Sequence, residues 1–276
     1  AEVPAGVTVL RGDASSVDSA RDVTRDAAVV YQCAQPAYHQ WPEKFPPLQH
    51  AVLQAAASQG AKLVLAENLY GYGEVEGAMH ESLPFRATTR KGRVRARMSE
   101  AALEAHRTGR LRVAIGRGSD FFGPGVRASA LGDRVFLPAL AGKTPRLGGA
   151  LDLPHSFTYI DDFGEALAVL GEHDEADGQA WHVPNDRPSI TQRELMNIVF
   201  EEIGLPPRMA GTSRMMMRLA GIFIAGARET VEMMYEFEKP FVVDSSKFER
   251  TFGMKATPIH EALRATIDWY NLKGLR

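Results

Sequence analysis

The chain of 276 residues has a single cysteine, Cys33, and no apolar run long enough to cross a bilayer. One cysteine excludes an internal disulfide framework and a zinc site built from cysteines, and it favours a reducing, cytoplasmic location. A spanning helix needs about 20 apolar residues. The longest candidate, residues 219–227, is short and lies between Arg218 and Arg228. We therefore expect a cytoplasmic protein with no membrane partner.

An excess of charge of one sign is also missing. The 32 basic and 34 acidic side chains give a formal net charge of -2. Such a chain has no global field that would attract nucleic acid or an anionic membrane. Hydrophobic residues at 45% and charged residues at 24% are typical of a globular protein. We expect no nucleic-acid partner and no metal.

Glycine is sparse at the beginning of the chain. Before Gly60 the only glycines are Gly6 and Gly12, so no G-x-x-G-x-x-G pattern can be drawn. Such a turn binds a dinucleotide's pyrophosphate at a helix N-terminus. We expect the parent protein to carry a further β-α-β unit of roughly 30 residues upstream. A naturally shortened chain is the alternative.

Short apolar runs alternate with helical segments, in the order typical of a parallel sheet covered by helices. The Pro-rich segment 41–47 should be irregular, and capping boxes are expected at Ser15 with Asp18 and at Thr191 with Glu194. The main expected elements are strands at 7–10, 28–33, 63–66, 111–115 and 179–183, and helices at 48–58 and 89–107. The fold class is α/β, a doubly wound parallel sheet (Rossmann-like) with a smaller C-terminal α/β substrate domain.

Two polar, glycine-rich breaks follow predicted strands, at residues 67–73 and 117–125. In open α/β sheets, ligands bind at the carboxyl ends of the strands, so both breaks should face one site. The basic helix between them places Lys91 and Arg95 on one face, because they are four residues apart. A binding site is therefore expected at this end of the sheet.

The order of these segments resembles the extended short-chain dehydrogenase/reductase family, the NAD-dependent epimerases and dehydratases. In that family a catalytic serine precedes a Val-Tyr-Gly ending, and the next helix carries a Tyr-x-x-x-Lys pair. Here Asn68 stands at the serine position before the Tyr-Gly of residues 72–73. Lys91 stands at the tyrosine position and Arg95 at the lysine position. All three catalytic positions are substituted.

The resemblance implies an NAD(P)-dependent oxidoreductase or epimerase/dehydratase that acts on a small carbonyl or sugar-type substrate, with NAD or NADP as cofactor. The proton then needs a new carrier, and we predict that Asn68 polarises the oxygen while Lys91, Tyr70 or water delivers the proton. The resemblance is also compatible with a homodimer. The predicted cofactor-binding residues are Asp13, Ala14, Cys33, Ala34, Gln35, Arg95 and Gly118.

Loss of the usual catalytic side chains leaves an alternative open, an NAD(P)-binding redox sensor without turnover. In either case we expect a dinucleotide-binding domain at residues 1–145 that lacks its first β-α-β unit. Residues 146–276 should mainly bind substrate, with 155–183 returning to the sheet. The methionines at 215–217 and 233–234 favour core packing over a lid for an apolar substrate.

Overall fold

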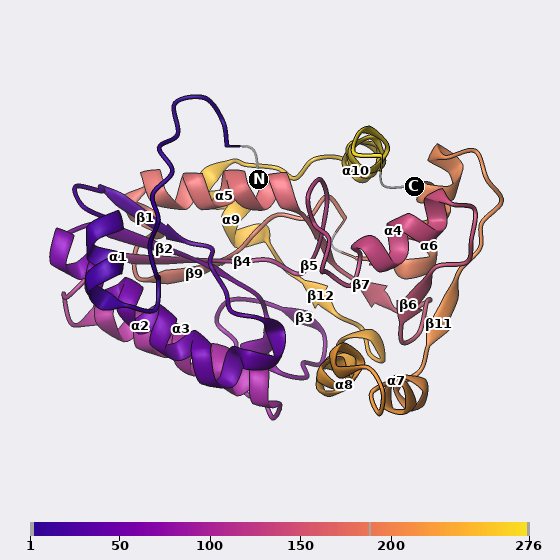
Figure 1. Cartoon of the computed structure of the whole chain (residues 1–276), viewed down its shortest axis with the longest axis horizontal. Coiled ribbons are helices and arrows are strands. Elements are labelled where there is room, and N and C mark those ends of the chain that lie inside the picture. Colours follow the sequence, from indigo (N-terminus) through magenta and orange to yellow (C-terminus); the bar gives the residue numbers. More distant parts are fainter. Residues whose placement is uncertain (1–2, 188, 275–276) are drawn as a thin grey trace.

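The computed structural model describes residues 3–187 and 189–274. Its central sheet consists of β1 (Val29–Gln32), β2 (Lys62–Glu67), β4 (Val113–Arg117) and β9 (Gln179–His182), side by side in that order (Figure 1). Each strand runs parallel to its neighbour. The parallel sheet predicted from the sequence is confirmed.

Helices cover both faces of the sheet (Figure 1). One face carries α2 (Trp41–Gln59) and α3 (Arg90–Arg107), and the other carries α5 (Ile160–Glu172). Alternate residues of β2 serve the two faces, because side chains of a strand point to opposite sides in turn. Leu63 packs into the core beside α2 and α3, whereas Val64 packs into the core beside α5. The sheet is doubly wound, as expected.

A second hydrophobic core lies beyond the carboxyl ends of the strands, among α4, α6 and α10, and includes Phe136, Phe200 and Leu263. The short strands outside the central sheet form separate two-stranded pairs. The remaining elements are α1 (Val17–Val23), η1 (Tyr38–Gln40), η2 (Tyr70–Tyr72), β3 (Ala78–Met79), β5 (Asp120–Phe122), α4 (Asp133–Leu140), β6 (Arg146–Gly148), β7 (Pro154–His155), β8 (Phe157–Tyr159), η3 (Asp174–Ala176), β10 (Ile190–Thr191), α6 (Gln192–Glu202), β11 (Ala210–Thr212), α7 (Arg214–Ala220), α8 (Ala225–Thr230), η4 (Val231–Phe237), β12 (Val242–Val243), α9 (Ser246–Phe252) and α10 (Ile259–Leu272).

The strand predicted at residues 7–10 is absent, and this prediction was wrong. The side chains of Val7, Val9 and Leu10 are more than half exposed. Within the described residues no strand lies on the free side of β1 for this segment to pair with. An isolated extended segment has neither ladder hydrogen bonds nor a covered face, so its apolar sequence alone does not make it a strand.

The segment 41–47 is helical rather than irregular, which corrects a second prediction. Pro42 lies at the start of α2, where a missing N–H is tolerated. Pro46 and Pro47 lie inside the helix and remove two of its hydrogen bonds. Trp41 and Phe45 are buried at 5% and 3% exposure. Their packing offsets the loss.

Of the two predicted capping boxes, one forms. Thr191 accepts from the backbone of Glu194 at 3.0 Å, and the Glu194 carboxylate accepts from the backbone of Thr191 at 2.8 Å. At α1 the cap is Ser16 instead of the predicted pair Ser15 and Asp18. Both serines suit a cap in sequence, and the structure uses the second.

The methionine-rich segment divides into a buried and an exposed part. Met233 and Met234 are buried, as predicted. Met215 and Met216, on α7, are 72% and 45% exposed, so the prediction of core packing was wrong for them. In the described ranges, no helix is both long and apolar enough to cross a membrane.

The α9 helix returns from the C-terminal part of the chain to the sheet, and Phe248 anchors it. This ring is fully buried and packs 4.8 Å from the Phe252 ring and 6.2 Å from the Trp181 ring. We expect Phe248→Ala to lower the free energy of unfolding by about 3–5 kcal/mol, because it leaves a cavity. Urea denaturation measures the change.

A matched control is Phe223→Ala, because Phe223 is 89% exposed. Its effect should remain within about 0.5 kcal/mol. Equal destabilisation by the two substitutions would contradict the assignment of Phe248 to the core.

Candidate active site

Asn68 and Tyr70 lie together just after β2, where the sequence placed a site. The Asn68 side-chain oxygen accepts from the Tyr70 backbone N–H at 3.2 Å, which holds the turn at η2. The Tyr38 hydroxyl, from η1 after β1, donates to the Tyr70 hydroxyl at 3.4 Å. Two adjacent strands therefore bring two phenols and an amide to one place.

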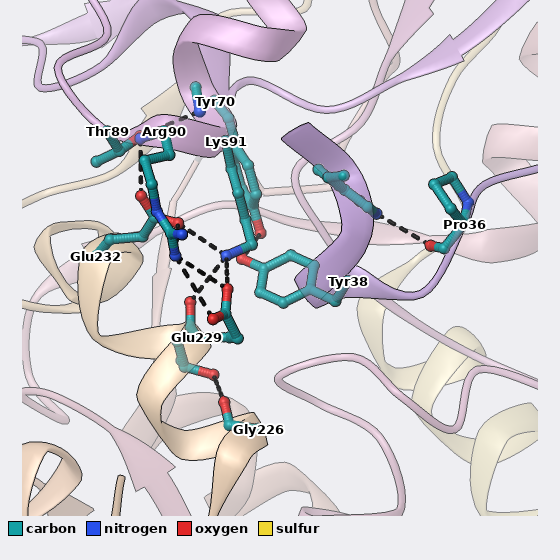
Figure 2. A network of polar contacts seen from close by, with 12 residues as sticks. Pro36, Tyr38, Tyr70, Thr89, Arg90, Lys91, Gly226, Glu229 and Glu232 are labelled. Carbon is teal, nitrogen blue, oxygen red and sulfur yellow. Dashed lines mark hydrogen bonds and ion pairs between the residues drawn. The ribbon is translucent and has the colours of Figure 1, made fainter. Parts of the chain in front are cut away.

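Lys91 is fully buried beside this pair (Figure 2). Its Nζ donates to Glu229 Oε2 at 2.6 Å and to Glu232 Oε1 at 2.7 Å. It also lies 4.4 Å from the centre of the Tyr38 ring. Lys91 of α3 is thus bound to the segment α8–η4, and its ammonium does not face solvent.

Arg90 completes this ion cluster from the first turn of α3 (Figure 2). Its guanidinium lies 3.2 Å from Glu229, and its backbone N–H donates to Glu232 at 2.8 Å. Burial raises the pKa of Glu229, but hydrogen bonds and charges from Lys91 and Arg90 outweigh burial and leave that pKa below its ordinary value. Two cations and two carboxylates therefore balance one another, as buried charges require.

Sequence reasoning missed the acidic side of this cluster. Glu229 and Glu232 are spaced by three residues, so they share one face of the helical run from α8 into η4. That spacing was visible within the methionine-rich segment. The sequence did not reveal that α3 is the partner helix, because Lys91 and Glu229 are 138 residues apart.

Glu236 and Tyr235 are buried at 2% and 6% exposure. In the part of the chain that the structure describes, neither Glu236 Oε1 nor the Tyr235 hydroxyl has a hydrogen-bond partner. Burial raises the pKa of Glu236 well above its ordinary value, and the charge of Asp120 raises it further. Burial likewise raises the pKa of Tyr70. Tyr70 therefore keeps its proton at neutral pH.

Asp120 itself is paired with a histidine. His155 Nε2 lies 2.7 Å from Asp120 Oδ2. The His155 ring is stacked among Phe157, Phe237 and Phe241 at centroid distances of 4.5, 5.2 and 5.0 Å. This pair fixes the strand end after β4 against the segment that follows η4.

A buried polar network fixes the carboxyl ends of β2, β4 and β9. Arg117 donates to Glu67 at 3.2 Å and to the Tyr72 hydroxyl at 2.6 Å. The Tyr72 hydroxyl lies 2.8 Å from His182 Nε2. Arg117, at the start of the break that the sequence predicts to face the site, thus orients the strand ends that support the site.

Cys33, Ala34 and Gln35 follow β1 and are exposed, so this loop is accessible to a ligand. Arg95 differs, because it is buried at 3% exposure and donates to the Ala66 carbonyl at 3.2 Å. Within the described residues, its Nε and Nη1 have no acceptor. These two buried donors fit a ribose hydroxyl or a phosphate oxygen, so the residues present are compatible with a dinucleotide.

For the other predicted cofactor-binding residues, the structure shows contacts within the protein. Asp13 is exposed and accepts from the Ser15 backbone at 2.9 Å. Ala14 is half-buried against the core beside α2. Gly118 is buried, and a Cβ there would lie 2.5 Å from the Phe121 ring. Contact of Asp13, Ala14 and Gly118 with a cofactor stays a prediction.

A doubly wound parallel sheet with polar side chains gathered at the strand ends defines the class of nucleotide-binding α/β proteins. Comparison with known families agrees and is more specific. The NAD dependent epimerase/dehydratase family matches residues 2–183, well over half of the chain. The chain belongs to this family. Among curated proteins, no match is found.

Solved structures similar to this chain include a UDP-glucuronic acid 4-epimerase from Bacillus cereus in complex with NAD, with 16% identity, a TM-score of 0.74 and coverage of 92% of this chain and 78% of the other. RMD from Pseudomonas aeruginosa, complexed with NADPH, has 18% identity, a TM-score of 0.75 and coverage of 98% and 90%. A dTDP-glucose 4,6-dehydratase from Bacillus anthracis in complex with NAD has 17% identity, a TM-score of 0.76 and coverage of 97% and 82%. At these identities the likeness shows the fold.

We expect the free energy of unfolding to depend on pH through His182. Burial, and after it the charge of Arg117, lowers the pKa of His182 to about 3 in the folded protein, against about 6.5 in an unfolded chain. The unfolded state then binds more protons between these values, so the folded state loses stability as the pH falls below about 6.5. Between pH 7 and 5 this histidine should account for about 2 kcal/mol of lost unfolding free energy.

Denaturation of the wild type and of His182→Gln at both pH values tests this expectation, since the variant should lose less stability on acidification. His39→Gln is the control, because His39 is exposed and should leave the pH dependence unchanged. The same loss in the wild type and in His182→Gln would show that His182 is not the group responsible.

Proposed function

We propose that this chain is an NAD(P)-dependent epimerase/dehydratase for a sugar-type substrate, with a proton carrier different from the usual tyrosine. Family membership supports the class of reaction. Structures of similar fold include an epimerase and a dehydratase of nucleotide sugars, which supports the substrate class. The observation that carries the proposal is the meeting of Tyr38, Tyr70 and Lys91 with the acidic face of α8–η4 at the ends of the strands.

The cofactor would lie across the carboxyl ends of β1 and β2. The exposed loop at Cys33, Ala34 and Gln35 leaves room for it after β1. The Nε and Nη1 groups of Arg95, which lack acceptors in the described structure, would bind its ribose or phosphate oxygens. When bound, the nicotinamide would exchange a hydride with a substrate carbon.

The proton would move through Tyr70. Its raised pKa keeps the hydroxyl protonated, so Tyr70 can donate to the oxygen of a carbonyl that gains the hydride, which yields the alcohol. The Tyr38 hydroxyl, 3.4 Å away, would then donate its proton to Tyr70 and take up another from solvent. The Asn68 side-chain oxygen is engaged by the turn, which leaves its amide N–H groups to polarise the substrate oxygen.

Lys91 has a positioning role in this proposal. Its ammonium already binds two carboxylates and is fully buried. A proton carrier must reach the reacting oxygen, whereas Lys91 holds α8–η4 and the Tyr38 ring in place. This differs from the direct acid role predicted for Lys91 from the sequence, which stays untested.

The capture of Lys91 also favours a second candidate function, an NAD(P)-binding redox sensor without turnover. Its ion pairs connect α3, which packs on the sheet, to α8–η4, so a structural change on cofactor binding could pass from the sheet to that segment. Binding of cofactor without any hydride transfer would select this alternative.

Titration of the protein with NADH and with NADPH, followed by fluorescence, tests the cofactor site. We expect micromolar affinity for one of the two. Ala34→Trp should abolish this binding, because a bulky side chain would fill the loop after β1. Ser58→Trp, at the exposed far end of α2, should retain it. Equal cofactor binding by both variants would show that the cofactor does not bind at this loop.

A second test concerns Tyr70. With reduced cofactor and a keto form of UDP-glucose, UDP-glucuronate or dTDP-glucose, the single-turnover loss of reduced-nicotinamide absorbance measures hydride transfer to the carbonyl. We expect Tyr70→Phe to slow transfer by about 10²–10⁴-fold, because it removes the proton donor, without changing cofactor affinity. Tyr31→Phe, at an exposed tyrosine of β1, should keep the wild-type rate. An unchanged rate in Tyr70→Phe would assign the proton to another group.

A further inference from the structure

The hairpin formed by α7, α8 and the turn between them exposes several large apolar side chains. Ile222, Phe223 and Ile224, in the turn, are 69%, 89% and 58% exposed. Met215 and Leu219, on α7, are 72% and 59% exposed. A group of large apolar side chains this exposed is typical of an interaction surface.

The hairpin is ordered by its own backbone. Phe223 and Ile224 each donate to the carbonyl of Ala220, at 3.1 and 2.9 Å. At Gly221 a Cβ would lie 2.9 Å from the Arg228 backbone, so only glycine lets the two helices approach this closely. In Figure 1 the hairpin lies at the lower edge of the molecule, away from the central sheet. The apolar turn is therefore held outward in a fixed shape.

The exposed charge around this turn is positive, because Glu229, the one carboxylate of α8, is paired with Lys91 and Arg90. Residues 204–228 contain four arginines and no lysine, aspartate or glutamate, in a chain whose net charge is -2. Arg214 is paired with Glu238 at 2.6 Å. Arg218 and Arg228 are exposed and form no ion pair within the described residues. The hairpin combines exposed apolar side chains with unpaired cations.

We propose that this hairpin docks on an anionic lipid surface. Ile222, Phe223 and Ile224 insert among the acyl chains near the headgroups, and Arg218 and Arg228 bind lipid phosphates. The absence of a spanning helix and the small net charge do not bear on a local surface of this kind. The proposal does not depend on the reaction of the site.

A second copy of this chain fits the surface less well. In a symmetric dimer the same patch would face itself, and its arginines would lie opposite arginines with no carboxylate among residues 204–228 to pair them. Like charges brought together at an interface oppose binding. A lipid bilayer with anionic headgroups satisfies both the apolar turn and the cations.

The test is co-sedimentation of the full chain with vesicles at about 0.1 M salt, where charges are screened beyond about 10 Å. We expect binding to phosphatidylglycerol/phosphatidylcholine vesicles and about tenfold weaker binding to phosphatidylcholine alone. Replacing Ile222 and Phe223 together by serine should weaken binding at least tenfold. Arg218→Glu with Arg228→Glu should remove the preference for anionic vesicles.

Leu272→Ser is the control, because Leu272 is 85% exposed on α10, outside the hairpin. It should bind vesicles as the wild type does, and thermal melting should show all variants folded. Failure of the wild type to bind anionic vesicles would overturn the proposal. So would equal loss in Leu272→Ser, or a dimer in sedimentation equilibrium that the Ile222/Phe223 serine variant abolishes.

Discussion

A buried ammonium must be neutralised, and the arrangement of the site depends on how Lys91 meets that requirement. Removing a charge from water costs several kcal/mol unless a well-placed partner compensates. Glu229 and Glu232 provide the compensation, and they can do so only if α8 and η4 lie against the start of α3. That docking in turn brings Tyr235 and Glu236 into the protein interior. The need to neutralise Lys91 therefore fixes the position of α8 and η4 against α3.

Most of the sheet could be predicted because its information is local. The apolar run around Leu63–Leu65 is short, is followed by a polar break and serves both faces, which is typical of a strand covered on two sides. Two of the wrong predictions, at residues 7–10 and 41–47, have non-local causes. Residues 7–10 have a strand-like sequence, but a strand also needs a neighbour. Residues 41–47 contain prolines that oppose a helix, yet the burial of Trp41 and Phe45 overrides them.

The candidate site was predictable on one side only. Asn68, Tyr70 and Lys91 belong to segments next to strand ends, and the order of those segments located them. The facing carboxylates, on α8 and η4, come from the last quarter of the chain, and no nearby sequence feature indicates that their partner is on α3. The three-residue spacing from Glu229 to Glu232 indicates a shared face. Only the folded structure shows what that face covers.

The length of chain between the two sides of the site has a consequence for biosynthesis. Lys91 and Glu229 are 138 residues apart. At a synthesis rate of about 5–20 residues per second, roughly 7–30 s pass between the appearance of the cation and that of its first carboxylate. During that interval the sheet can form around a still hydrated Lys91. The site is therefore completed late in synthesis, and the nascent chain can form its sheet well before it can bind a substrate.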